Sequence, residues 1–167
     1  MCAARRLYAK HGYEVPRSAI AKAAGVSQAV MYRHFPKRVD LALEVFEDNY
    51  AHIDRIVDEG GPKAIFALWD WLLQQVTLDV GFIETIRAAR EESPGYDGPT
   101  RLLRALQVAL DRARCEGLAV GDLQAEDLMQ AWRMAYGVVV ASRPGEVTPA
   151  LLKSMLPLEA VRRLFDK

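Results

Sequence analysis

Apolar residues recur along this chain at spacings of three and four, which is the period of an amphipathic α-helix. Glycines and prolines, beginning with Gly12, Pro16, Gly25 and Pro36, interrupt these runs at places where helices would begin or end. No run alternates apolar and polar residues beside a hairpin turn, so the pattern predicts no β-sheet. We therefore predict an all-α chain of about nine helices, at residues 1–11, 16–24, 27–35, 39–59, 62–79, 81–92, 99–116, 123–142 and 148–166.

Three of the predicted helix starts carry capping residues. Ser27 and Thr148 supply a side-chain oxygen for the free N–H groups of their helices, and Asp122 is expected to do the same before residues 123–142. The start at residue 39 differs, because Lys37 and Arg38 place two cations at the positive end of the helix dipole. Such a start is easier to understand if the two cations have another task.

The segment that joins the second and third predicted helices has the sequence logic of a helix-turn-helix. Ile20, Ala21 and Ala24 form the inward face of the first of these helices, and the small Ala21 permits close approach of the second. Gly25 takes the tight turn between them. Val26 is expected to fill the angle between the two helices.

The third predicted helix offers polar and small side chains on the faces away from its core. Met31 and Phe35 are four residues apart and share the buried face. An amide, a small apolar group, a phenol and a guanidinium project from the other faces, at Gln28, Ala29, Tyr32 and Arg33. These groups match base edges, thymine methyls and phosphates in a DNA major groove.

Charge is distributed unequally, although the chain as a whole has a formal net charge of zero. Residues 1–38 hold eight Lys or Arg and a single acid, Glu14, whereas residues 39–167 hold fourteen Lys or Arg and twenty-one acids. The first segment therefore carries a charge of +7 and the second a charge of −7. This split favours a polyanion as the partner of the amino-terminal segment.

Composition argues against several other classes of protein. With 51% hydrophobic and 26% charged residues, the chain resembles soluble globular proteins. No apolar run approaches the roughly 18 residues of a membrane span, and no secretory signal follows the first basic pair, so we expect a cytoplasmic protein. Cys2 and Cys115 form neither a metal-ligand spacing nor a disulfide framework, and we expect no metal and no cofactor.

No catalytic residues emerge from the sequence. The three histidines lack metal-ligand spacing, and there is no Gly-rich phosphate loop or zinc-protease motif. Glu91 and Glu92 are adjacent, so on a helix they face apart. The chain is expected not to be an enzyme. The alternative to a DNA-binding regulator is a helical small-molecule-binding or adaptor protein without specific DNA binding.

The stretch from Ala3 to about Phe46 resembles the amino-terminal domain of the TetR family of bacterial transcriptional regulators. The resemblance rests on Ala-Arg-Arg-Leu-Tyr, His-Gly-Tyr, Ile-Ala-Lys-Ala-Ala-Gly-Val-Ser and Tyr-Arg-His-Phe-Pro. It implies a DNA-binding domain over residues 1–46 and an effector-binding and dimerisation domain over residues 47–167. The chain departs from the family in Ala29-Val30, where Gly-Thr is frequent, in the Lys37-Arg38 exit, and in opening inside the first helix.

The resemblance also implies a division of DNA contacts. Base contacts would come from Gln28, Ala29, Val30 and Arg33. Phosphate contacts would come from Tyr32, His34, Lys37 and Arg38, with Arg17 and Ser18 clamping the backbone from the other side. Ser27 would lie in the same surface as the capping residue of the recognition helix.

The second domain is implied to hold an effector pocket. The helix at 62–79 is apolar over a wide arc, because Trp69 and Trp71 are about 200° apart on a helix. A mostly apolar cavity would suit a small apolar or aromatic effector, although core packing also explains each of these aromatics. The candidate ligand-binding residues are Phe66, Trp69, Phe82, Ile86, Leu106, Trp132 and Tyr136.

The helices near 123–142 and 148–166 are implied to form a homodimer interface, although some of their apolar residues serve the intramolecular core. Two-fold pairing would place two recognition helices one helical turn of DNA apart. We therefore expect a DNA-binding transcriptional regulator, and more specifically a ligand-responsive repressor that binds a palindromic operator as a dimer.

Overall fold

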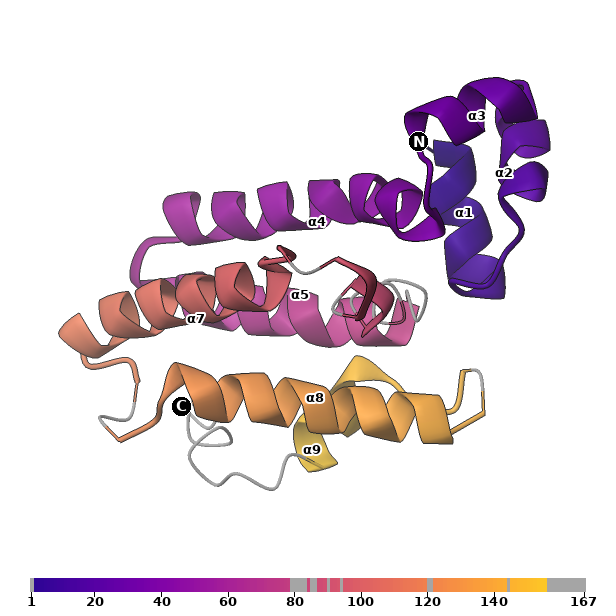
Figure 1. Ribbon diagram of the computed structural model, residues 1–167. Helices are drawn as coiled ribbons and strands as arrows, with labels where there is room; N and C mark the ends of the chain where they lie inside the picture. Colours follow the sequence, from indigo (N-terminus) through magenta and orange to yellow (C-terminus); the bar gives the residue numbers. More distant parts are fainter. Residues whose placement is uncertain are drawn as a thin grey trace. The chain divides into compact units, whose positions relative to one another are not determined.

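The structure is a computed structural model, and it describes residues 2–78, 84, 87–89, 91–93, 95–119, 122–143 and 145–155. In chain order its elements are α1 (Cys2–His11), α2 (Arg17–Ala24), α3 (Gln28–His34), α4 (Arg38–Glu59), the 3₁₀-helix η1 (Gly61–Lys63), α5 (Ala64–Leu78), α7 (Gly98–Cys115), α8 (Ala125–Ala141) and α9 (Pro149–Met155) (Figure 1). These residues contain no strand, so the all-α prediction is confirmed. None of their helices is long and apolar enough to span a membrane.

The chain divides into two compact units. The head unit comprises Met1–Asn49 and Leu78–Tyr96, and the body unit comprises Tyr50–Thr77 and Asp97–Lys167. Helix α4 contributes its first part to the head unit and its last part to the body unit. The head unit thus contains a segment that follows α5 in the sequence, besides the predicted helix-turn-helix.

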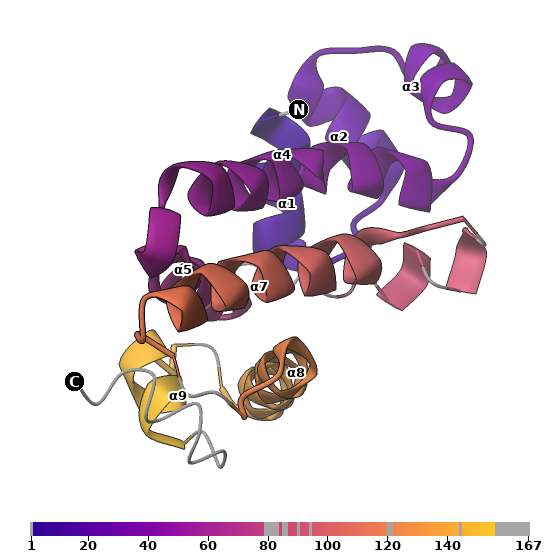
Figure 2. The same ribbon diagram turned by 90° about the vertical axis from the view of Figure 1, so that its left-hand side faces the viewer.

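In the head unit, α2 contacts both α1 and α3, and the chain passes from α3 through a short turn into α4 (Figures 1 and 2). Tyr8 lies at the centre and is fully buried. Its ring centroid is 5.9 Å from that of Phe46 and 6.5 Å from that of Tyr13. The Arg5 guanidinium donates to the Val45 carbonyl and to the Asn49 side-chain oxygen, at 2.9 and 3.0 Å. These contacts join α1 to α4.

In the body unit, α5 is buried over a wide arc, as its sequence predicted. Trp69 is fully buried whereas Trp71 is only partly buried, so the two rings do face apart. The Trp132 indole of α8 donates to the carbonyl of Leu72 on α5 at 3.4 Å. Lys153 of α9 forms an ion pair with Asp70 of α5. Helices α8 and α9 therefore both pack on α5.

Most helix ends match the sequence prediction, but one cap does not. The side-chain oxygens of Ser27 and Thr148 accept backbone N–H groups three residues on, at 3.3 and 3.2 Å, and confirm the predicted caps. Asp122 does not cap α8, which begins at Ala125. Gln124 and Asp127 cap it instead, because their spacing of three lets each side chain bond to the other's backbone N–H.

Two predicted elements fall partly outside the described residues. Only part of the predicted helix at 81–92 is described, and Phe82 and Ile86 are not. Of the predicted helix at 148–166, the described part is α9.

In the head, Ala24 is exposed, so its predicted place on the inward face of α2 is wrong.

Candidate DNA-binding site

The turn between α2 and α3 depends on Gly25. This residue has a φ of 68°, in the left-handed region, and its N–H donates to the Lys22 carbonyl at 3.3 Å. The next N–H, of Val26, donates to the Ala21 carbonyl at 3.0 Å. This paired pattern is the Schellman end of a helix. Among the described residues, no atom outside its chain neighbours lies within 4 Å of the place a Cβ would take at Gly25. Glycine is therefore favoured here by the backbone conformation and not by a lack of space.

The angle between α2 and α3 is filled from within the two helices. Ile20 and Ala21 are each 1% exposed and Met31 is 6% exposed. Val26 is 42% exposed, so the prediction that it fills this angle is wrong. It lines a surface hollow of about 450 Å³ instead, together with Pro16, Ser18, Ala19, Lys22 and Gln28. The hollow lies along the side of the helix pair that carries the start of α3.

The outward face of α3 is accessible along its length. Met31 is the buried residue of this helix, and its other side chains are exposed, at Gln28, Ala29, Val30, Tyr32, Arg33 and His34. The amide, aliphatic, phenol and guanidinium groups thus stand on a short helix that no described element covers. This is the arrangement that reading a major groove requires.

Arg17 has structural contacts that the sequence did not reveal. Its guanidinium donates to the carbonyls of Phe35 and Pro36, at 2.8 Å each. It also lies 4.4 Å from the ring centroid of Tyr32. Arg17 therefore holds the end of α3 and the following turn, and it positions one of the predicted phosphate ligands.

The start of α4 has a cap that the sequence analysis missed. The backbone N–H of Lys37 donates to the Asp40 carboxylate at 2.8 Å. An acid three residues beyond a helix start is half of a capping box, so the spacing Lys37 to Asp40 was a usable signal. The carboxylate also offsets the unfavourable position of the two cations at this end of the helix dipole.

Both cations of this exit have partners within the head unit. The Lys37 ammonium donates to the backbone carbonyl of Glu92 at 3.4 Å. Arg38 forms an ion pair with Glu14 and lies 5.6 Å from the ring centroid of Tyr13. Glu14 is the single acid of residues 1–38 and its side chain is 81% exposed. Phosphate contacts by either cation would have to replace or extend these contacts.

A cluster of two tyrosines stands behind the helix-turn-helix. Burial raises the pKa of Tyr8 to about 12, although the guanidinium groups of Arg38 and Arg17 act in the opposite direction. Burial, followed by the nearby carboxylate of Glu92, raises the pKa of Tyr13 to about 12. Both rings are neutral at physiological pH. The buried hydroxyl of Tyr8 has no hydrogen-bond partner in the described part of the chain.

Glu84 closes the turn after α1 from far along the sequence. Its carboxylate accepts the backbone N–H of Tyr13 at 2.6 Å. The preceding Gly12 has a φ of 73°, and a Cβ at this position would lie 2.6 Å from the same carboxylate. No local sequence pattern predicts this contact, because 71 positions separate its two residues.

The candidate ligand-binding residues of the body unit differ in exposure. Trp69 and Leu106 are fully buried, Trp132 is 6% exposed, and Phe66 and Tyr136 are partly exposed. The remaining two candidates, Phe82 and Ile86, lie outside the described residues. The described residues contain no group of three or more His, Cys, Asp or Glu that could hold a metal ion.

Comparison with known proteins points to one family. Residues 1–45 match the family described as bacterial regulatory proteins, tetR family. The chain is 31% identical to the nucleoid occlusion factor SlmA of Marinomonas sp. (strain MWYL1), and the alignment covers 81% of this chain and 68% of that protein.

A solved structure shares the fold over nearly the whole chain. It is the TetR transcriptional regulator SCO0520 from Streptomyces coelicolor, with a TM-score of 0.61 and 24% sequence identity. The match covers 98% of this chain and 90% of the other. Together with the helix-turn-helix geometry, these likenesses establish that the chain is a transcriptional regulator and not an enzyme, and that it belongs to the TetR family of bacterial regulatory proteins.

Proposed function

We propose that this protein is a ligand-responsive repressor that binds a palindromic operator as a dimer in the cytoplasm. The observation that carries the DNA-binding part is the exposed face of α3, which presents an amide, aliphatic groups and a guanidinium beyond a capped, glycine-dependent turn. The charge of +7 over residues 1–38 supplies attraction to the phosphates.

The proposed contacts divide between bases and backbone. Gln28, Ala29, Val30 and Arg33 would face base edges from the exposed start and middle of α3. The backbone would be held by Ser18, Tyr32, His34, Lys37 and Arg38, near Ser27 at the head of α3. Arg17 would contribute by positioning Tyr32, because its guanidinium already bonds to two carbonyls.

A dimer interface is proposed on α8 and α9, within a body domain that we propose to span residues 47–167 after a DNA-binding domain at 1–46. Exposed apolar side chains on these two helices support it: Met134 at 49%, Val140 at 54%, Leu151 at 41% and Met155 at 49%. Solvated apolar groups at several points on two neighbouring helices favour burial against a second copy.

The effector is proposed to be a small apolar or aromatic molecule bound near the aromatics of α5 and α8. Trp69 supports this placement, because its fully buried indole N–H has no hydrogen-bond partner in the described part of the chain. Binding would change operator affinity only if the effector bound two conformations with different affinity. A thermal-shift screen, followed by operator binding with each hit, would test this part.

The DNA-binding proposal is tested by selecting genomic fragments with the intact chain and measuring affinity against salt. Gln28→Ala is expected to alter sequence preference, with a loss of about 1–3 kcal/mol at the base pair it reads. Lys37→Gln is expected to weaken binding to all sequences alike and to reduce the salt slope by about 1. Absence of specific, salt-dependent binding would favour the alternative of a helical ligand-binding or adaptor protein.

A second candidate function follows from the 31% identity to a nucleoid occlusion factor. Such a role would couple DNA binding to the placement of cell division. Deleting the gene and imaging septa would test it, because septa that cross the nucleoid would support the role. Normal septum placement together with altered transcription would support the repressor alone.

A further inference from the structure

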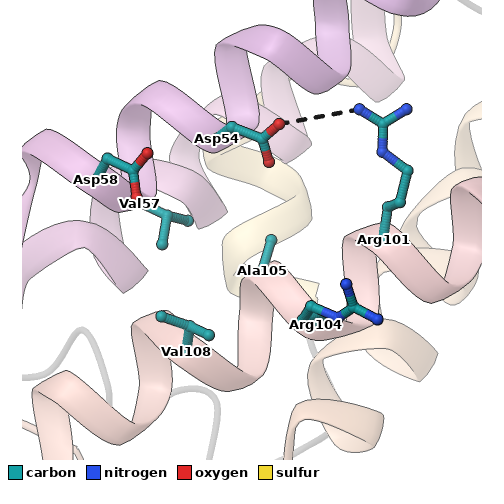
Figure 3. A pocket seen from close by; sticks show the side chains of 7 residues that line it. All are labelled: Asp54, Val57, Asp58, Arg101, Arg104, Ala105 and Val108. Carbon is teal, nitrogen blue, oxygen red and sulfur yellow. Dashed lines mark ion pairs between the residues drawn. The ribbon is translucent and has the colours of Figure 1, made fainter.

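A groove of about 410 Å³ runs between α4 and α7 in the body unit. Figure 3 shows Asp54, Val57 and Asp58 on α4 facing Arg101, Arg104, Ala105 and Val108 on α7. Acids thus line one wall and arginines line the other. None of these residues is among those proposed above to contact DNA, the effector or a second copy.

One end of the groove is closed by an ion pair. Arg101 lies 3.8 Å from the Asp54 carboxylate, and its guanidinium stands 4.4 Å from the ring centroid of Tyr50. The aromatic ring and the carboxylate together hold Arg101 against α4.

The other two charged residues of the groove are unpaired. Neither Asp58 nor Arg104 forms a hydrogen bond or an ion pair with any described residue, and both side chains are exposed. They come from opposite walls, so the groove offers an acceptor for a cation on α4 and a donor for an anion on α7 (Figure 3).

The surface between the charged walls is apolar. Val57 and Ala105 are 6% and 8% exposed, and Val108 is 37% exposed. An aliphatic side chain resting on these three residues would remove apolar surface from water on both partners. The acidic wall, the basic wall and the apolar surface between them therefore favour a ligand that has a cationic group, an anionic group and an aliphatic part.

We propose that this groove binds a small apolar zwitterion of the size of a dipeptide, with its ammonium at Asp58, its carboxylate at Arg104 and its aliphatic side chains on Val57, Ala105 and Val108. A guanidinium fork matches a carboxylate with two parallel hydrogen bonds, and an ammonium matches a single carboxylate acceptor. The volume of about 410 Å³ lies within the range of small-molecule sites. A protein partner would need a much larger surface than this groove offers.

The proposal goes beyond the proposed function, and it is tested on the full chain without DNA. The probe is the dipeptide Leu-Leu, compared with N-acetyl-Leu-Leu, which lacks the ammonium, and Leu-Leu-amide, which lacks the carboxylate. Because both charged residues are exposed, we expect a Kd of about 0.1–1 mM for the dipeptide by titration calorimetry or NMR. Each blocked derivative should bind about three- to tenfold more weakly.

Two variants test which residue binds each charged end of the dipeptide. Asp58→Asn should weaken the dipeptide by about three- to tenfold and leave N-acetyl-Leu-Leu unchanged, because that derivative has no ammonium to lose. Arg104→Gln should weaken the dipeptide by a similar factor and leave the amide unchanged. Arg133→Gln, an exposed arginine on α8 outside the groove, is the matched control and should change nothing. Thermal melts would establish that all three variants fold.

Three results would overturn the proposal. These are no binding of the dipeptide at about 10 mM, equal binding of all three peptides, and dipeptide binding that survives both groove substitutions. None of them bears on operator binding, so failure here is distinguishable from failure of the regulator proposal.

Discussion

Arg17 shows at the scale of one residue how a positive charge near DNA can have a structural task. The sequence assigned it to the phosphate backbone, by resemblance. In the structure its guanidinium bonds to the carbonyls of Phe35 and Pro36 and stacks on Tyr32. A lysine would keep the charge but could not make the two bonds together with the stacking contact.

Arg17→Lys is therefore expected to lower the free energy of unfolding by about 1–2 kcal/mol, because charge-assisted bonds to two carbonyls are lost. Operator affinity should fall as well, since Tyr32 loses its support. Urea unfolding and a DNA titration measure the two effects. Arg33→Lys, at an exposed position on α3, is the control and should leave stability unchanged. If the Arg17 variant were as stable as the parent, the contacts of Arg17 would not stabilise the fold, and its role would be purely electrostatic.

Tyr8 allows a prediction about pH. Its pKa is raised from 10.0 to about 12 by burial, so the unfolded chain loses this proton before the folded chain does. The folded state therefore holds more protons between about pH 10 and 12, and stability must fall as pH rises through that window. Below pH 10 the group contributes the full stability of its neutral form.

Tyr8→Phe should remove part of this alkaline loss. Its buried hydroxyl has no partner among the described residues, so the variant should be as stable as the parent at pH 7, or more stable by about 1 kcal/mol. Thermal melts of both proteins at pH 7 and at pH 11 make the comparison. A clear loss of stability at pH 7 would indicate that the hydroxyl has a partner after all.

At the scale of single elements, Gly25 is the position on which the helix-turn-helix depends most directly. Gly25→Ala is expected to cost about 1–2 kcal/mol, because a side chain disfavours a positive φ. Gly25→Asn should cost less, since asparagine tolerates the left-handed region. Urea unfolding ranks the three proteins. The surroundings of this glycine are open, so equal stability of the alanine variant would mean that the turn adopts another conformation.

The elements also show which features a sequence can predict. Ser27 and Thr148 were correct as caps because a cap is decided within four residues. Asp122 was wrong for a related reason, since Gln124 and Asp127 form a reciprocal pair that competes with it within the same few residues. Val26 was wrong because its burial depends on how α2 and α3 pack, and a turn motif does not specify that.

At the scale of the whole molecule, contacts between residues far apart in the sequence determine which partners the side chains of the candidate site have. The exposed face of α3 followed from periodicity, so Gln28, Tyr32 and Arg33 were predictable. The partners of Lys37 and Tyr13 were not, because Glu92 and Glu84 lie 55 and 71 positions away. The charge split predicted a basic head. It did not indicate that Lys37 and Arg38, at the start of α4, already have partners within that unit.

The proposed dimer makes the last prediction, because a palindromic operator requires two heads. Met134→Glu and Leu151→Glu place a carboxylate among exposed apolar groups on α8 and α9. Burying an unpaired charge opposes association, so each should raise the dimer dissociation constant by about tenfold or more. Leu78→Glu, at a 69% exposed leucine on α5, is the control and should leave the dimer intact.

Sedimentation at several concentrations and two DNA probes separate the possible outcomes. If α8 and α9 form the interface, the two variants should lose affinity for a probe with both half-sites much more than for a probe with one. The reason is that the second head is tethered only while the dimer holds, and tethering adds affinity without any new contact. Equal loss on both probes would place the defect in the head itself, and an unchanged dimer in both variants would exclude this surface.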